Sequence, residues 1–190
     1  MKMDNNKQFI KLAIGCGKRR YPGYIHIDKY PDNKNEVIKM EAHDTSFMAE
    51  SINIIYACHV LEYYDWQEVE KKVLPHWFYI LKYGGILRVA VPDFGAMAGL
   101  YYLYGTNLSK FIGPLYGKMN VGDTTIYHKS CFDVETLVKM LCNTGFTNVH
   151  RYNWRATDIA DVDDHSQAYL PHMDKDNGTL ISLNLECEKV

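Results

Sequence analysis

The stretch that decides the fold is KLAIGCGKRRYPGYIHID, from Lys11 to Asp28. One apolar run leads into Gly15-Cys16-Gly17, and a second, 24–27, ends in Asp28. The pattern predicts a strand, a glycine turn and a second strand that closes with an acid. Glycines permit a tight turn and a close approach of the backbone to a ligand. An acid in this position accepts hydrogen bonds from the hydroxyls of a ribose, so the stretch predicts a site for a cofactor that contains adenosine.

The spacing of the same stretch argues against a dinucleotide cofactor. A nicotinamide site has the pattern G-x-G-x-x-G at the start of a helix, with the acid about 20 residues further on. Here Arg20 stands where the third glycine belongs, and Asp28 follows Gly17 after only 11 residues. A cofactor with a ribose and no pyrophosphate fits better. A nicotinamide-dependent oxidoreductase and an ordinary turn between strands stay open as alternatives.

Length and composition indicate a single domain, 1–190, in a reducing compartment. The chain has 190 residues, enough for a sizeable core. Its net charge of −2 gives no general attraction to nucleic acid. The five cysteines form no Cys-x-x-Cys pair, which favours free thiols and a cytoplasmic location over disulfides or a zinc site. No apolar run has the length of a membrane span.

Strand and helix signals alternate along the chain. Apolar runs predict strands at 9–14, 24–27, 37–40, 52–60, 86–91, 146–152 and 180–188. A capping box at Asp65 opens a helix that Pro75 splits and Gly84 ends, and further helices are predicted at 94–104 and 133–142. The alternation predicts an α/β fold: a Rossmann-like, doubly wound, mostly parallel sheet with helices on both faces. Only nine residues, 15–23, join the first two strands, so the first crossover helix must be short or absent.

Three longer sequence segments carry a family resemblance. They are LAIGCG at 12–17, IIYACHVLE at 54–62 and LKYGGILRVAVPD at 81–93. With them the chain resembles the class I methyltransferases that use S-adenosylmethionine, and more narrowly the small bacterial group encoded among surface-polysaccharide genes. The resemblance implies the class I methyltransferase fold, whose last strand is antiparallel. The cofactor contacts that it implies are Gly15, Cys16 and Gly17 under the methionine part, Asp28 on the ribose, Asp44 beside the adenine, and Cys58 with His59 near the methyl group.

One position departs from the pattern of this family. The family often continues Leu-Glu-His, and here Tyr63 stands in place of that histidine. A protein that keeps the fold and binds the cofactor, but has lost catalysis, is therefore an alternative to an active methyltransferase.

Methyl transfer to an oxygen requires alignment of the nucleophile and benefits from a general base. His128 lies in the segment 105–129, which is predicted to form a loop or lid, and Asp93 ends a predicted central strand. These two residues are the leading candidates for the base, ahead of the other histidines. The structural alternatives are a histidine that only packs and an aspartate that caps the following helix.

The substrate prediction depends on two predicted loop or lid segments, 105–129 and 153–178, which combine aromatic with acidic side chains. Aromatic faces beside carboxylates suit a sugar ring, and the candidate contacts are Tyr127, Asp164, His165 and Tyr169. We therefore expect O-methylation of a sugar, nucleotide sugar or surface-glycan intermediate, unless these aromatics only pack the loops onto the sheet. No basic stripe accompanies them, so no nucleic-acid partner is expected. The acids at 161–165 fit a solvated loop better than a metal site, so no metal is predicted.

Overall fold

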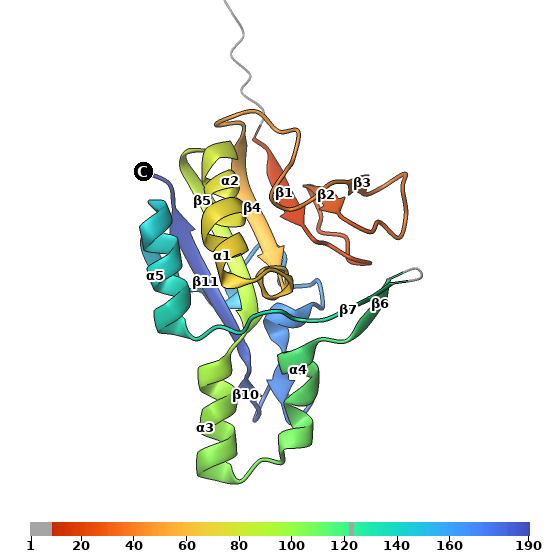
Figure 1. Ribbon diagram of the computed structural model, residues 1–190, viewed down its shortest axis with the longest axis vertical. Coiled ribbons are helices and arrows are strands. Elements are labelled where there is room, and N and C mark those ends of the chain that lie inside the picture. Colours follow the sequence, from red (N-terminus) through yellow and green to blue (C-terminus); the bar gives the residue numbers. More distant parts are fainter. Residues whose placement is uncertain (1–8, 122–123) are drawn as a thin grey trace, which may run out of the picture.

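The central element of the protein is a mixed β-sheet (Figure 1). The computed structural model describes residues 9–121 and 124–190. Within these residues the sheet has seven strands in the order β3-β2-β1-β4-β5-β11-β8. Their bounds are β1 Lys11–Ile14, β2 Tyr24–Asp28, β3 Ile38–Lys39, β4 Ile52–Cys58, β5 Leu81–Pro92, β8 Thr147–Arg151 and β11 Ser182–Glu188. β1 to β5 are parallel and β11 is antiparallel to both neighbours, which confirms the predicted fold class.

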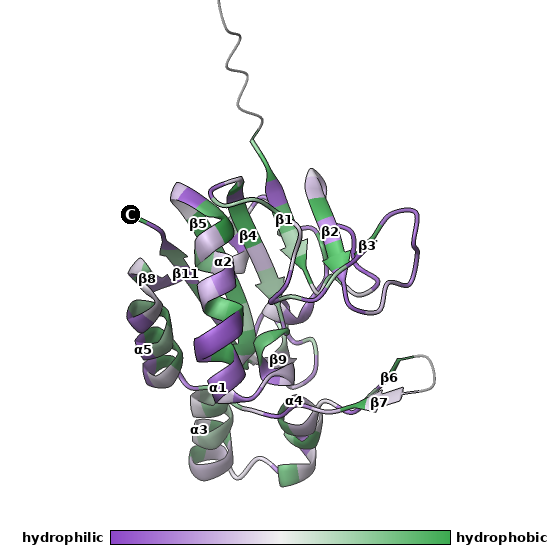
Figure 2. Cartoon of the chain, turned by 45° about the horizontal axis from the view of Figure 1, so that its top comes forward, coloured by the Kyte–Doolittle hydropathy of each residue, from purple (hydrophilic) through white to green (hydrophobic). Residues whose placement is uncertain are grey.

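Helices cover one face of this sheet. They are α1 (Trp66–Glu68), the π-helical turn η2 (Val69–Val73), α2 (Leu74–Ile80) and α5 (Val134–Thr144). The predicted capping box is present, because Asp65 Oδ1 accepts from Glu68 N at 2.9 Å and Glu68 Oε2 accepts from Asp65 N at 3.3 Å. Trp77 of α2 and Leu137 of α5 share one buried core with Ile55 of β4. Figure 2 shows the hydrophobic strands β1, β4 and β5 beneath a helix whose outer side is hydrophilic.

The first long helix ends earlier than its sequence predicts. It stops at Ile80, and β5 begins at Leu81. Leu81 pairs with Ile52 of β4 and is fully buried, so pairing with the neighbouring strand removes these residues from the helix. Pro75 lies in the first turn of α2, directly after the π-helical turn, and the backbone stays helical from Trp66 to Ile80, so the predicted split is a π-helical turn and not a break.

The second face of the sheet differs from the prediction of helices on both faces. Its core contains Tyr56 of β4, Tyr21 from the loop after β1 and Ile159, and none of its described residues belongs to an α-helix. The segment 152–168 covers this face with two short 3₁₀ turns, η4 (Trp154–Ala156) and η5 (His165–Gln167). The physical reason is the short connection between β1 and β2, which contains no helix.

Several smaller elements lie outside the main sheet and form the lower part of the molecule in Figure 1. They are α3 (Phe94–Tyr104), η3 (Leu108–Lys110), α4 (Ile112–Tyr116), the hairpin of β6 (Met119–Val121) and β7 (Thr124–Ile126), and the small sheet of β9 (Tyr169–Leu170) with β10 (Thr179–Leu180). The segment 105–129 is thus more regular than the loop that the sequence predicts. Among the described residues, no helix is long and apolar enough to cross a membrane.

Candidate active site

The glycine turn after β1 lies against the end of β4. Gly15 N donates to Ile27 O at 2.9 Å, which fastens the turn to β2. Gly15 has φ +65°, and a Cβ there would lie 2.5 Å from Val60 Cγ2, so only glycine fits. Gly17 also has a positive φ, +56°, and a Cβ at that position would meet open space. The turn therefore offers partly exposed backbone at Gly15 and Gly17 to a ligand, at the carboxyl ends of two central strands.

Asp28 joins the ends of two loops through its carboxylate. Its Oδ2 accepts from Gly17 N at 2.9 Å and its Oδ1 accepts from Tyr30 N at 2.7 Å. The residue is only partly buried, and each carboxylate oxygen can accept a second hydrogen bond. Asp28 can thus hold the two loops and still accept bonds from a pair of vicinal hydroxyls. The residues at this position fit the ribose of the predicted cofactor.

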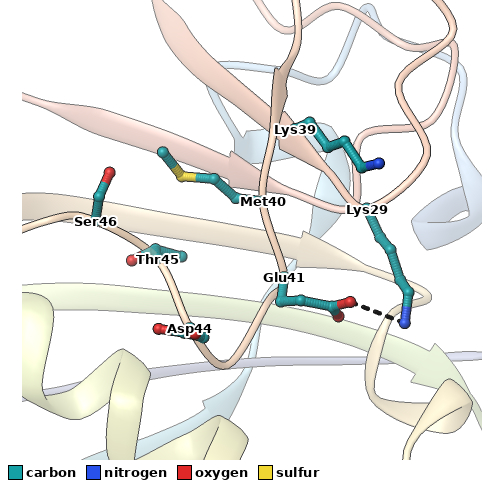
Figure 3. A pocket seen from close by; sticks show the side chains of 7 residues that line it. All are labelled: Lys29, Lys39, Met40, Glu41, Asp44, Thr45 and Ser46. Carbon is teal, nitrogen blue, oxygen red and sulfur yellow. Dashed lines mark ion pairs between the residues drawn. The ribbon is translucent and has the colours of Figure 1, made fainter.

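A cleft of about 500 Å³ adjoins Asp28 at the edge of the sheet. Its lining residues are Lys29, Lys39, Met40, Glu41, Asp44, Thr45 and Ser46 (Figure 3). Lys29 and Glu41 reach toward one another, with 2.8 Å between Lys29 Nζ and Glu41 Oε1, and Asp44 lies on the turn that follows. The structure therefore brings Asp44, predicted from sequence beside the adenine, to a cleft next to the predicted ribose site.

The two cysteines of the predicted site are unreactive thiols. Cys16 is 3% exposed, and its Sγ donates to Gly17 O at 3.6 Å. Burial, with a smaller contribution from the charge of Asp28, raises the pKa of Cys16 to about 12. Burial also raises the pKa of Cys58. Because the thiolate is the nucleophilic form, these side chains serve packing and shape at the site.

His59 and Glu62 form a buried pair where β4 ends. His59 has a left-handed backbone with φ +55°, which is uncommon for a residue other than glycine. Its Nδ1 lies 3.3 Å from Glu62 Oε1, and its buried Nε2 has no hydrogen-bond partner within the described residues. Glu62 is fully buried, and neither of its carboxyl oxygens has a hydrogen-bond partner among the described residues. Burial raises the pKa of Glu62 to about 8 and lowers that of His59.

Glu62 is the residue that sequence reasoning missed. The signal was present, because this acid interrupts the apolar run of Val60 and Leu61 at the carboxyl end of a buried strand. An unpaired carboxyl group in the interior is costly, and perturbed acids of this kind gather at functional sites.

His128 lies on the other side of Glu62, with both ring nitrogens facing protein. Its Nδ1 donates to Pro114 O at 2.9 Å, and its Nε2 lies 3.9 Å from Glu62 Oε1. The ring also lies against the α-carbon of Gly117, where a Cβ would overlap it, and contacts the edge of Tyr63. Burial lowers the pKa of His128. The ring of His128 thus packs between α4 and the turn η1 (Leu61–Tyr63), while its Nε2 makes no hydrogen bond among the described residues.

Asp93 is placed as a helix cap instead of as an open base. It is 4% exposed, its Oδ1 accepts from Ala96 N at 3.1 Å, and its Oδ2 accepts from Arg151 Nη2 at 3.1 Å. Both oxygens are therefore engaged in holding α3 and β8. The structural alternative for this residue, a cap on the following helix, explains its geometry.

The four predicted substrate contacts are not brought together. Asp164 is buried, and its oxygens accept from Tyr21, Tyr56 and Ser166, so it anchors the segment 152–168 to the sheet. Tyr169 is 8% exposed, and its hydroxyl accepts from Trp154 and Arg155. Tyr127 is 48% exposed, on the segment after β7. Of the four, only His165 lies at the predicted site, with its ring centre 5.0 Å from that of His59.

Metal binding finds no support in the described part of the chain. No group of three or more His, Cys, Asp or Glu residues there is arranged to hold a metal ion. The acids at 161–165 include the buried anchor Asp164 and the exposed Asp163, which pairs with Lys175 at 3.0 Å.

Comparison with known proteins is informative at the level of the fold. No protein-family model matches the chain, and no curated protein matches it. An S-adenosylmethionine-dependent methyltransferase from Methanosarcina mazei superposes with a TM-score of 0.56 at 15% identity, over 97% of this chain and 94% of that one. The chain has the class I methyltransferase fold. Further such enzymes from Archaeoglobus fulgidus (TM-score 0.54, 14% identity, 96% and 87% covered) and Mesorhizobium loti (0.52, 13%, 95% and 90%) share it.

Proposed function

We propose that the protein is an S-adenosylmethionine-dependent methyltransferase. The observation that carries the proposal is the position of Asp28 at the carboxyl edge of a sheet with this fold. Its carboxylate accepts hydrogen bonds from Gly17 N and Tyr30 N, and it can still accept hydrogen bonds from a ribose. Bound there, the cofactor supplies an electrophilic methyl group on a positively charged sulfur. The predicted contacts are Gly15 to Gly17 for the methionine part, Asp44 for the adenine end, and Cys58 with His59 for the methyl end.

Asp28→Ala is expected to weaken binding of S-adenosylmethionine by about 1–3 kcal/mol, roughly 5- to 150-fold in Kd, because charge-assisted bonds to the ribose are lost. Titration calorimetry measures it. Asp32→Ala is the matched control, since Asp32 pairs with Arg20 at 2.8 Å and its loss should leave Kd within twofold. Asp28→Asn, checked by its melting temperature, separates ribose recognition from folding of the turn. Tight binding of NAD with no response to S-adenosylmethionine would overturn the cofactor assignment.

For the substrate we propose a hydroxyl of a sugar, nucleotide sugar or surface-glycan intermediate. Supporting this, exposed aromatics on the segment 105–129, such as Tyr116 at 58% and Tyr127 at 48% exposure, leave ring faces available for a sugar. The cytoplasmic location expected from the free cysteines suits an intermediate of glycan synthesis.

Methyl transfer from labelled cofactor is expected with at least one carbohydrate of a panel that holds nucleotide sugars, glycan fragments, RNA and small phenols. The measured quantity is label in the acceptor after separation from the cofactor. Transfer to RNA or phenols alone would contradict the substrate class and leave the enzyme class intact. Cofactor binding without transfer to any acceptor would favour the binding-only alternative.

A further inference from the structure

We propose that His59 is the proton acceptor for methyl transfer to an oxygen, and that the buried carboxyl group of Glu62 orients its ring. This inference rests on the proposed function and names the group that receives the proton of the acceptor hydroxyl. It assigns the role to a residue that the sequence placed at the cofactor and ranked behind His128 and Asp93 as a base, and it gives Glu62 the task of a positioning residue.

The position of His59 suits this role. His59 follows the last residue of β4, and its N donates to Ala90 O of β5 at 2.8 Å, which fixes it at the carboxyl edge of the sheet. The next residue, Val60, is the one that a Cβ on Gly15 would strike, so His59 lies beside the glycine turn. Its left-handed φ of +55° is a strained conformation held by these contacts, and such strain concentrates at functional sites.

The two nitrogens of His59 have different surroundings. Nδ1 lies 3.3 Å from Glu62 Oε1, a distance within the reach of a hydrogen bond that the present ring orientation does not make. Catalytic hydrogen bonds are often long before the substrate binds. When Glu62 is ionised it can only accept, which places the ring proton on Nδ1 and leaves the lone pair on Nε2. Nε2 is the buried nitrogen without a partner in the described chain, and a substrate hydroxyl would satisfy it.

The neighbouring candidates differ from His59, whose Nε2 is buried without a hydrogen-bond partner among the described residues. His128 directs Nδ1 to Pro114 O, and its Nε2 faces Glu62 and Gly117. Asp93 has both oxygens engaged. His165 lies exposed beside His59 from the segment 152–168, where it borders the approach to the ring.

The proton transfer balances without a further reactant. The oxygen of the acceptor forms its bond to the methyl carbon while the carbon–sulfur bond breaks and leaves its electron pair on sulfur. The O–H proton moves to Nε2 of His59, and the imidazolium that results is balanced by the carboxylate of Glu62. His59 starts unprotonated, because burial and the nearby His165, His128 and Arg19 lower its pKa. Solvent removes the proton after the product leaves.

Nitrogen NMR of labelled histidine tests the geometry without turnover. At pH 9, with S-adenosylhomocysteine as the probe, His59 is expected to be neutral with its proton on Nδ1 in the wild type and to lose that preference in Glu62→Leu. Glu62→Gln should restore the preference, because the amide oxygen accepts from Nδ1. A proton on Nε2 in the wild type, or the same tautomer in all three proteins, would overturn the orientation by Glu62.

Turnover with the carbohydrate panel tests the chemistry. His59→Asn, whose new side chain tolerates a left-handed backbone, is expected to lower kcat about 100-fold or more, a larger factor than its change in cofactor Kd. His150→Asn, at the exposed side of β8, is the matched control and should keep full activity. Wild-type kcat should fall as the pH drops through about 8, and Glu62→Gln should remove that dependence. Full activity of His59→Asn would overturn the proposal, whereas failure of cofactor binding in the wild type would instead refute the proposed function.

Discussion

Glu62→Gln is expected to stabilise the folded protein at alkaline pH by about 3–5 kcal/mol more than it does at pH 5. Glu62 is fully buried without a hydrogen-bond partner among the described residues, and its pKa rises from 4.5 to about 8. Between these values the folded state keeps a proton that the unfolded state releases. The wild type therefore loses stability as the pH rises from about 4.5 to 8, and a neutral glutamine does not.

Urea unfolding of the wild type and Glu62→Gln at pH 5, 7 and 9 measures this difference. Glu68→Gln is the matched control: Glu68 lies 3.1 Å from Lys129 Nζ, a pair that lowers its pKa, so its replacement should bring no gain at high pH. A difference between wild type and Glu62→Gln that is constant over this pH range would show that Glu62 titrates as an ordinary acid. If the gain is found, the natural chain carries an acid that weakens its fold, as residues retained for activity often do.

Asp164→Ala is expected to lower the free energy of unfolding by about 3–5 kcal/mol, because it leaves several buried donors unpaired. The carboxylate accepts from Tyr56 Oη at 2.6 Å, Tyr21 Oη at 3.0 Å, and Ser166 N and Oγ at 2.9 and 2.6 Å. These bonds join the segment 152–168 to β4 and to the loop after β1, across the sheet face on which the described residues form no α-helix.

Two controls identify the cause of that loss. Asp163→Ala removes an exposed neighbour paired with Lys175 and should change the unfolding free energy by less than about 0.5 kcal/mol. Tyr56→Phe should be costly in the wild type and nearly neutral in Asp164→Ala, because the hydroxyl has then already lost its acceptor. Independent, additive losses would contradict the shared network. A small effect of Asp164→Ala alone would show that the segment is held by its apolar contacts.

The glycine turn and its acid could be predicted because their physics is local. Gly15, Gly17 and Asp28 lie within one strand–turn–strand unit, and the structure connects Asp28 to Gly17 N directly. The capping box at Asp65 could also be predicted, because its two members, Asp65 and Glu68, are only three residues apart. The short first connection was predictable from its length alone. The parallel class of the sheet followed from strand signals that alternate with helix signals along the chain. The period and order of these signals do not depend on which residues pack against them.

Contacts between residues that are far apart in the sequence could not be predicted. Asp93 meets Arg151, 58 residues away, and Asp164 meets Tyr56, 108 residues away, and these bonds give both predicted functional acids structural partners. Leu81 belongs to β5 and not to the predicted helix, because it pairs with Ile52 of the neighbouring strand β4.

By itself, then, the sequence determined the parallel sheet, the glycine turn and the acid at the end of β2, because spacing along the chain sets strands, turns and caps. The tertiary structure alone decided which polar groups are engaged and which are free. Hydrogen bonds engage both oxygens of Asp93 and Nδ1 of His128, whereas the oxygens of Glu62 and Nε2 of His59 are buried without hydrogen-bond partners among the described residues. Whether a side chain anchors the fold or meets a ligand depends on the atoms that reach it from other elements, and only folding brings those atoms together.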